Sequence, residues 1–161
     1  MPTLIWFLLS HSYNQIIPSY IYKPSSRISP LSKKILYTYG QHFDGIVAHR
    51  RDNYELLANQ LTDIEGCTVL FPDLDDGICP YAFPLLVEDP DRYISLLNKQ
   101  GVPAQKWPDL PEAVRNDSIF SMSTNYASRL ILLPIHQTIS IRTIYKIAKV
   151  VKSTNLFITG I

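Results

Sequence analysis

Residues 81–101 read YAFPLLVEDPDRYISLLNKQG and contain a strand signal followed directly by a helix signal. The apolar run at residues 81–87 is typical of a short buried strand. Asp89 can cap the free amides of a helix that begins at Pro90, and Gly101 supplies the stop of that helix. The helix residues predicted to face a core are Tyr93, Leu96 and Leu97. The segment therefore predicts a strand joined to an amphipathic helix.

The same two kinds of pattern recur outside this segment. Short strand-like runs lie at residues 67–71, 102–107 and 129–133, next to turn residues. Ser140 can cap a last helix. Its apolar stripe consists of Ile141, Ile144, Ile147, Ala148 and Val151. We therefore expect an α+β fold, in which helices pack on one face of a small, mostly antiparallel sheet.

A long helical pattern precedes the strands. Apolar residues recur at steps of three and four through most of residues 30–62, and Ser29 followed by a proline provides a capped start. Gly40 and Gly45 weaken the middle of this pattern, because glycine lowers helix stability. We therefore expect one long helix with a bend near these glycines.

Composition limits the class of protein. The chain has 161 residues, of which 46% are hydrophobic and 18% charged, with a formal net charge of +1. These values fit one ordinary globular domain, exclude intrinsic disorder and argue against nucleic acid as a partner. The basic carboxyl-terminal helix also lacks aromatic residues between its basic positions, apart from Tyr145. Cys67 and Cys79 fit neither a disulfide framework nor a zinc site, so we expect reduced thiols in or near the core of a cytoplasmic protein.

The apolar run from Leu4 to Leu9 raises the question of a membrane or export segment. It is much too short to span a bilayer, and no lysine or arginine precedes it as in a signal peptide. A buried strand is the preferred prediction, and no membrane partner is expected. A weak export signal is the alternative.

One polar cluster, Arg50-Arg51-Asp52-Asn53-Tyr54, lies on the long predicted helix. Two adjacent guanidinium groups could hold a phosphate or a carboxylate. Neighbouring helical residues, however, point about 100° apart, so the two arginines are expected to diverge. Pairing on the helix surface is the preferred interpretation.

Two further clusters are candidates for a binding site. In Lys106-Trp107-Pro108-Asp109-Leu110-Pro111, a tryptophan beside a cation and rigid prolines suits the wall of a cleft, or it closes the edge of the core. In Leu133-Pro134-Ile135-His136-Gln137, an imidazole follows a buried strand. It is expected to be fixed by a backbone hydrogen bond.

The sequence contains no recognisable catalytic constellation. It has no phosphate-binding glycine loop and no paired-histidine metal motif, and its four histidines are dispersed. We therefore assign no catalytic, cofactor-binding or metal-ligating residue within the chain.

Taken in order, these features resemble the carboxyl-terminal small domain of fold-type I pyridoxal-phosphate aminotransferases, in particular the DegT/DnrJ/StrS family. The similar segments are Arg50–Tyr54, Tyr81–Val87, Gly101-Val102-Pro103, Trp107-Pro108 and Leu132–His136. The resemblance covers residues 29–152, with an interdomain helix at 30–62. It leaves residues 1–28 as an unmatched strap and residues 153–161 as a tail.

In that family, a preceding large domain holds pyridoxal phosphate as a Schiff base on a lysine. The resemblance therefore implies that this chain lacks the cofactor lysine, binds no pyridoxal phosphate alone and is inactive alone. It implies that Trp107 and His136 line the substrate side and that Lys106 meets an anionic group. The implied partners are the missing large domain or a homodimer partner, and a small-molecule substrate for which a nucleotide sugar is one candidate. The alternative is a non-catalytic interaction domain derived from such an enzyme.

Overall fold

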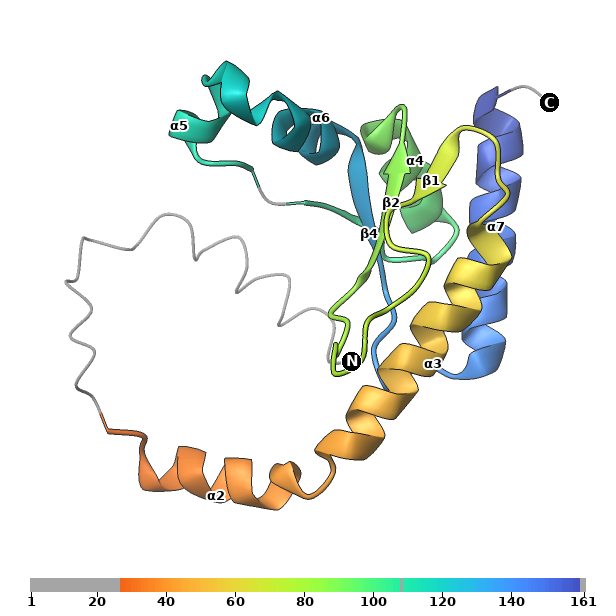
Figure 1. Cartoon of the computed structure of the whole chain (residues 1–161). Helices are drawn as coiled ribbons and strands as arrows, with labels where there is room; N and C mark the ends of the chain where they lie inside the picture. The colour runs from red at the N-terminus through yellow and green to blue at the C-terminus, as the bar shows by residue number, and fades with distance from the viewer. Residues whose placement is uncertain (1–26, 108, 160–161) are drawn as a thin grey trace. The chain divides into compact units, whose positions relative to one another are not determined.

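The computed structural model describes residues 27–107 and 109–159. The chain divides into two compact units, residues 1–40 and 41–161. Figure 1 shows the course of the chain. In chain order the elements are α2 (Pro30–Gly40), α3 (Phe43–Leu61), β1 (Cys67–Val69), β2 (Phe83–Val87), α4 (Pro90–Lys99), β3 (Gln105–Lys106), α5 (Glu112–Arg115), the 3-10 helix η1 (Ser118–Phe120), α6 (Ser121–Arg129), β4 (Leu130–Leu133) and α7 (Ile141–Thr159). The apolar run from Leu4 to Leu9 lies outside the described residues.

The helix α2 is the described part of the first unit. Ser29 caps it as expected, because its hydroxyl oxygen accepts a hydrogen bond from the Ser32 amide at 3.1 Å. No residue of α2 is buried. The helix expected at residues 30–62 is interrupted near the expected weak point, since α2 ends at Gly40 and α3 begins at Phe43. The interruption follows the first of the two glycines, where helix propensity is lowest.

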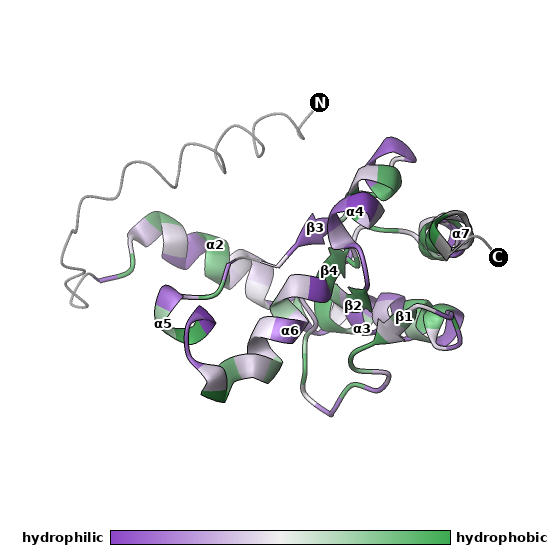
Figure 2. Ribbon diagram, turned by 90° about the horizontal axis from the view of Figure 1, so that it is seen from above, coloured by the Kyte–Doolittle hydropathy of each residue, from purple (hydrophilic) through white to green (hydrophobic). Residues whose placement is uncertain are grey.

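The four strands of the second unit form one sheet in the order β1-β2-β4-β3. All three pairs are antiparallel, and Phe83 faces Leu133 while Leu85 faces Ile131. The antiparallel sheet and the α+β fold are therefore confirmed. The strands are shorter than the apolar runs that predicted them, because a run counts as a strand only where a neighbour pairs with it. Figure 2 shows that the central strands β2 and β4 are hydrophobic and the edge strand β3 is hydrophilic.

The main core lies between one face of the sheet and the helices α3, α4 and α7. The sheet contributes Phe83, Leu85, Val87, Ile131 and Leu133 to this core. Each alternates with a residue that faces the other way, as the two-residue period of a strand requires. The Tyr54 ring of α3 packs on Phe83 with ring centroids 4.8 Å apart. This burial of aromatic and aliphatic surface holds the sheet and helices together.

Local signals at the helix ends are confirmed. The Asp89 carboxylate accepts a hydrogen bond from the Arg92 amide at 3.1 Å, and Gly101 adopts φ 80° after α4. Ser140 caps α7 through the Thr143 amide. One stripe residue differs from expectation, since Ile141 is 62% exposed at the first turn of α7. The helix continues to Thr159, through most of the segment that the resemblance left as a tail.

The two cysteines have different surroundings. Cys67 is buried, whereas Cys79 is exposed, so the expectation that both lie in or near the core is wrong for Cys79. The Cys67 sulfur contacts the Tyr93 hydroxyl at 3.3 Å, and that hydroxyl donates to the Asn155 side-chain oxygen. Burial raises the pKa of Cys67 and of Tyr93. This polar network ties β1 to α4 and α7.

A long connection, residues 107–129, leads from β3 to β4 through α5, η1 and α6. Figure 1 shows α5 and α6 on the opposite side of β4 from α7. Leu86 and Leu130 pair across the strands and are buried outside the main core. Within the described residues, no helix is both long enough and apolar enough to span a bilayer.

Candidate functional site

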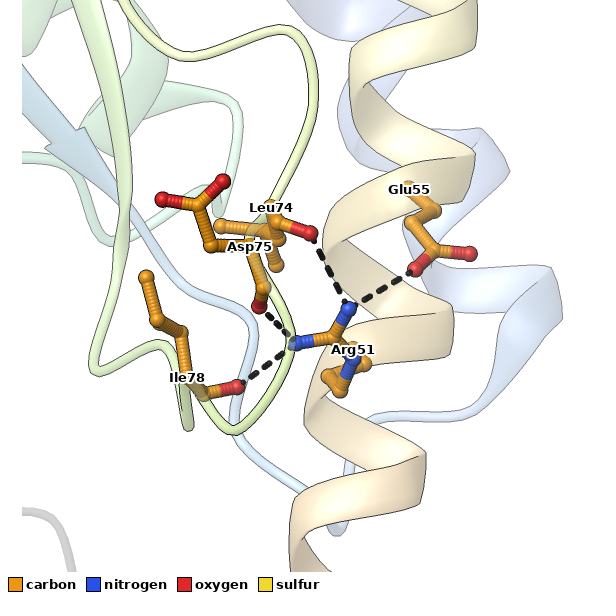
Figure 3. Close-up of polar contacts among 5 residues, drawn as sticks. All are labelled: Arg51, Glu55, Leu74, Asp75 and Ile78. Atoms are coloured by element: carbon orange, nitrogen blue, oxygen red, sulfur yellow. Dashed lines mark hydrogen bonds and ion pairs between the residues drawn. The ribbon is translucent and has the colours of Figure 1, made fainter.

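Arg51 of α3 holds the loop that joins β1 to β2. Its Nη1 atom donates to the main-chain oxygens of Asp75 at 2.8 Å and Ile78 at 2.9 Å, and its Nη2 atom donates to Leu74 at 3.2 Å. The Glu55 carboxylate lies 3.9 Å from Nη2 (Figure 3). A guanidinium matches several carbonyls at once because its five donors form a fixed fork. Arg51 therefore fixes the shape of this loop.

Arg50 points to a different set of acceptors. Its Nε atom donates to the Gln137 side-chain oxygen at 2.8 Å, and its Nη1 atom donates to the main-chain oxygen of Pro80 at 3.0 Å. The two arginines therefore diverge, as their adjacent helical positions predict. They do not hold a common anion. Arg51 pairs with Glu55 on the helix surface, as the preferred interpretation expects, and both arginines also donate to oxygen atoms of the loops.

The remaining polar residues of this cluster act in the same way. The buried Asn53 amide donates to the main-chain oxygens of His136 and Ile139, both at 3.2 Å. The Tyr54 hydroxyl donates to the main-chain oxygen of Phe71 at 2.7 Å, and burial raises its pKa to about 12. Four side chains of α3 thus hold two loops that flank the sheet. We call Arg50, Arg51, Asn53 and Tyr54 the α3 clamp.

Trp107 lies where β3 meets the β3–β4 connection. Its amide approaches the Leu130 carbonyl at 3.5 Å, which extends the pairing with β4, and its side chain is 45% exposed. It forms part of a hollow of about 240 Å³ that we call the Trp107 hollow. The lining residues are Lys106, Trp107, Asp109, Leu110, Arg115, Thr124, Ala127 and Ser128. The sequence had not singled out Arg115, Thr124 or Ser128, because no local pattern marks them.

Lys106 is engaged within the protein. Its Nζ atom lies 3.1 Å from both carboxylate oxygens of Asp91, at the start of α4. A cofactor lysine needs a nitrogen that is free to form an imine. The surroundings of Lys106 therefore do not fit that role, and we derive no step through pyridoxal phosphate in this chain. The expected contact of Lys106 with a ligand anion stays a prediction.

His136 lies in a different place from Trp107. The Thr138 amide donates to its Nδ1 atom at 3.3 Å, so the imidazole is fixed by the backbone as expected. A neutral ring in this arrangement carries its proton on Nε2. His136 lines a second hollow of about 150 Å³ together with Tyr81, Gln105 and Pro134, among others. The structure therefore places Trp107 and His136 in separate hollows.

Metal-binding groups are not gathered in the part of the chain that the structure describes. Residues 27–107 and 109–159 contain no set of three His, Cys, Asp or Glu side chains that could hold a metal ion. The side chains that line the described hollows are suited to binding a ligand. They combine aromatic surface, hydroxyl groups and a few charges.

Comparison with solved structures shows which known proteins contain a similar fold. The chain has the fold of part of the aminotransferases of the DegT/DnrJ/EryC1/StrS type. Against the aminotransferase TlmJ from Streptoalloteichus hindustanus the TM-score is 0.69 at 18% identity, over 80% of this chain and 37% of TlmJ. Against a DegT DnrJ EryC1 StrS aminotransferase from Brucella abortus the TM-score is 0.67 at 18% identity, over 80% and 36%.

A further structure extends the match along the chain. DesV from S. venezuelae, solved in complex with a ketimine intermediate, gives a TM-score of 0.70 at 15% identity, over 96% of this chain and 45% of DesV. The chain thus spans less than half the length of each of these enzymes. No protein-family model matches the sequence, and no curated protein matches it either. The likeness at these identities is one of fold.

Proposed function

We propose that this chain is the small-domain portion of a pyridoxal-phosphate-dependent aminotransferase of the DegT/DnrJ/StrS type. In this role it shapes the substrate side of an active site whose cofactor lysine lies outside these residues. The observation that carries the proposal is the fold likeness to aminotransferases, which for TlmJ spans 80% of this chain but 37% of that enzyme. The order of the sequence features, from the Arg50 cluster to the Leu132–His136 segment, supports the same assignment.

The residues of this chain serve such a role by holding surfaces in place. The α3 clamp fixes the loops at residues 71–81 and 136–139, so that binding a substrate does not require these segments to be ordered at that moment. Trp107 offers a rigid aromatic surface with little rotamer freedom to lose. His136 offers an Nε2 proton as a hydrogen-bond donor. The substrate is a small molecule, for which a nucleotide sugar is one candidate.

The helix α2 supports the need for a partner. Its apolar side chains are exposed in the structure, among them Leu31 at 69% and Tyr37 at 78%. Such surface is usually covered by another domain or subunit. We propose that it packs on the missing large domain or on a homodimer partner. Sedimentation of the chain with and without Leu31→Asp tests this, and equal sedimentation of monomers for both proteins would argue against it.

The absence of the cofactor chemistry can be tested directly. The purified chain is mixed with pyridoxal phosphate, and the absorbance of the Schiff base is recorded before and after borohydride reduction. We expect no specific lysine adduct by mass spectrometry, because the sequence shows no catalytic constellation around a lysine and Lys106 is paired with Asp91. A stoichiometric adduct on one lysine would overturn this part of the proposal.

The alternative is an interaction domain that keeps the fold without catalysis. The discriminating observation is the coding sequence that precedes these residues. A large aminotransferase domain encoded in the same frame, or in an adjacent gene, supports the enzyme. A preceding region without such a domain favours the interaction domain.

A further inference from the structure

Arg115 stands between two hollows of the β3–β4 connection. It ends α5 and lines the Trp107 hollow as well as a neighbouring hollow of about 520 Å³, which we call the serine hollow. Its guanidinium has no hydrogen bond or ion pair with any residue that the structure describes. Arg50, Arg51 and Lys106, by contrast, are all occupied by protein oxygens. Arg115 is therefore a cation available to a ligand.

The two hollows differ in lining. The Trp107 hollow includes the apolar side chains of Trp107 and Leu110. The serine hollow is lined by several hydroxyl groups, and Thr124 and Ser128 line both hollows. A ligand that contacts Arg115 in both hollows would therefore meet apolar surface as well as hydroxyl groups.

The shared hydroxyl groups are prepared to accept hydrogen bonds. Thr124 donates its proton to the Phe120 carbonyl at 3.2 Å, and Ser128 donates to the Asn125 carbonyl at 2.8 Å. Each hydroxyl oxygen therefore keeps lone pairs for a donor such as a ligand hydroxyl. The combination of a free guanidinium with hydroxyl acceptors suits an anionic, hydroxyl-bearing molecule.

The charge of the site limits the number of anionic groups. Asp109 lines the Trp107 hollow, and Asp117 lines the serine hollow. The Asp117 carboxylate accepts a hydrogen bond from the Ile119 amide at 2.9 Å. Lys106 is neutralised by Asp91. One free cation among these carboxylates can stabilise one oxyanion group, whereas a second, separate anionic group would meet repulsion from the carboxylates.

We propose that Arg115 anchors a single oxyanion, either a phosphate monoester or a carboxylate, of a hydroxyl-bearing small molecule that spans the two hollows. The inference rests on the proposed function only for the statement that this molecule is a substrate. The guanidinium fork matches both kinds of oxyanion by paired hydrogen bonds. Arg115, rather than Lys106, is then the anion-recognising residue of the site.

The test is a titration of the full 161-residue chain, followed by calorimetry and by amide shifts of residues 115–128. Four probes are compared: glucose 6-phosphate, gluconate, glucose and UDP-glucose. We expect glucose 6-phosphate or gluconate to bind at least about tenfold more tightly than glucose, because a charge-assisted hydrogen bond is lost in the neutral probe. Tighter binding of glucose 6-phosphate would identify the oxyanion as a phosphate, and tighter binding of gluconate would identify it as a carboxylate. UDP-glucose is expected to bind no more tightly than the better of these two.

Three variants make the test specific to the guanidinium. Arg115→Gln is expected to weaken oxyanion binding about tenfold, and Arg115→Lys to restore part of it. Arg142→Gln on the exposed face of α7 is the matched control and is expected to change binding less than about twofold, since Arg142 lines neither hollow. Unchanged binding in Arg115→Gln overturns the proposal, and so does equal binding of glucose or failure of both oxyanions to bind. If oxyanion binding holds but no aminotransferase domain is encoded nearby, only the proposed function is lost.

Discussion

The side-chain amide of Asn53 in α3 donates to the main-chain oxygen of His136, 83 residues further along the chain. The same amide also reaches the Ile139 oxygen, so one buried group fixes the turn between β4 and α7. Asn53 is 3% exposed, so water has little access to its side-chain amide. The main chain of the candidate ligand-binding residue His136 is thus held by a helix that lies much earlier in the chain.

This relationship predicts a large cost for removing the amide. Asn53→Leu leaves the two carbonyls without their partner and is expected to lower the free energy of unfolding by about 2 kcal/mol. Urea denaturation followed by circular dichroism measures the change. Asn116→Ala is the control, because that side chain is exposed and makes no hydrogen bond in the structure. If Asn53→Leu lowered the free energy of unfolding no more than Asn116→Ala, the stabilising role assigned to Asn53 would be contradicted.

Arg51 predicts a local effect on the loop between β1 and β2. Arg51→Gln removes the fork that binds Leu74, Asp75 and Ile78, so local opening of residues 72–80 should become easier. Amide hydrogen exchange in this loop is expected to accelerate by about tenfold, since each lost hydrogen bond to the charged guanidinium had stabilised the closed form of the loop. Arg142→Gln on the exposed face of α7 should leave it unchanged. Equal exchange in both variants would show that the loop holds its shape without Arg51.

Tyr54 predicts a decline of stability at alkaline pH. Its pKa rises from 10.0 to about 12 in the folded protein because the hydroxyl is buried. The unfolded chain then loses this proton first, so stability is complete below about pH 10 and falls as pH rises toward 12. Tyr54→Phe should reduce this decline. It should also cost about 1 kcal/mol at neutral pH, through the lost hydrogen bond to Phe71.

Tyr93 shares in the alkaline decline, because burial also raises its pKa. The measurement is therefore the difference between wild type and Tyr54→Phe in chemical denaturation at several values of pH. If the two curves stay parallel above pH 10, then Tyr54 titrates as it does in the unfolded chain, and the predicted linkage is absent.

The two thiols should react at very different rates. Cys79 is exposed, whereas Cys67 is buried and its pKa is raised by that burial. Because the thiolate is the reactive form, a thiol reagent should modify Cys79 rapidly and Cys67 slowly in the native protein. Ellman's reagent, added before and after unfolding, measures this. Cys79→Ser should abolish the rapid phase, and a rapid phase that persists in this variant would place the reactive thiol at Cys67.

The overall class of fold could be predicted because its signals are local. Asp89, Gly101 and Ser140 act on amides within a few residues, and hydrophobic periods of two and 3.6 residues mark strands and helices. Strand ends were less predictable. β1 ends at Val69, and β3 has only two residues, because the length of a strand depends on where its neighbour pairs. Likewise, Gly40 marked a weak point but could not show that the helix would be interrupted.

The candidate site divides along the same line. The sequence by itself determined which side chains are candidates for the site: the divergent arginines of α3, the aromatic ring of Trp107 and the imidazole of His136. Only the tertiary structure decided their targets. In the folded protein, Arg50 forms a hydrogen bond with Gln137, 87 residues further along the chain, and Lys106 forms an ion pair with Asp91. Trp107 and His136 lie in separate hollows. The physical reason is range, since caps and periodicity act within one turn, whereas a hydrogen bond between distant segments exists only once packing has brought them together.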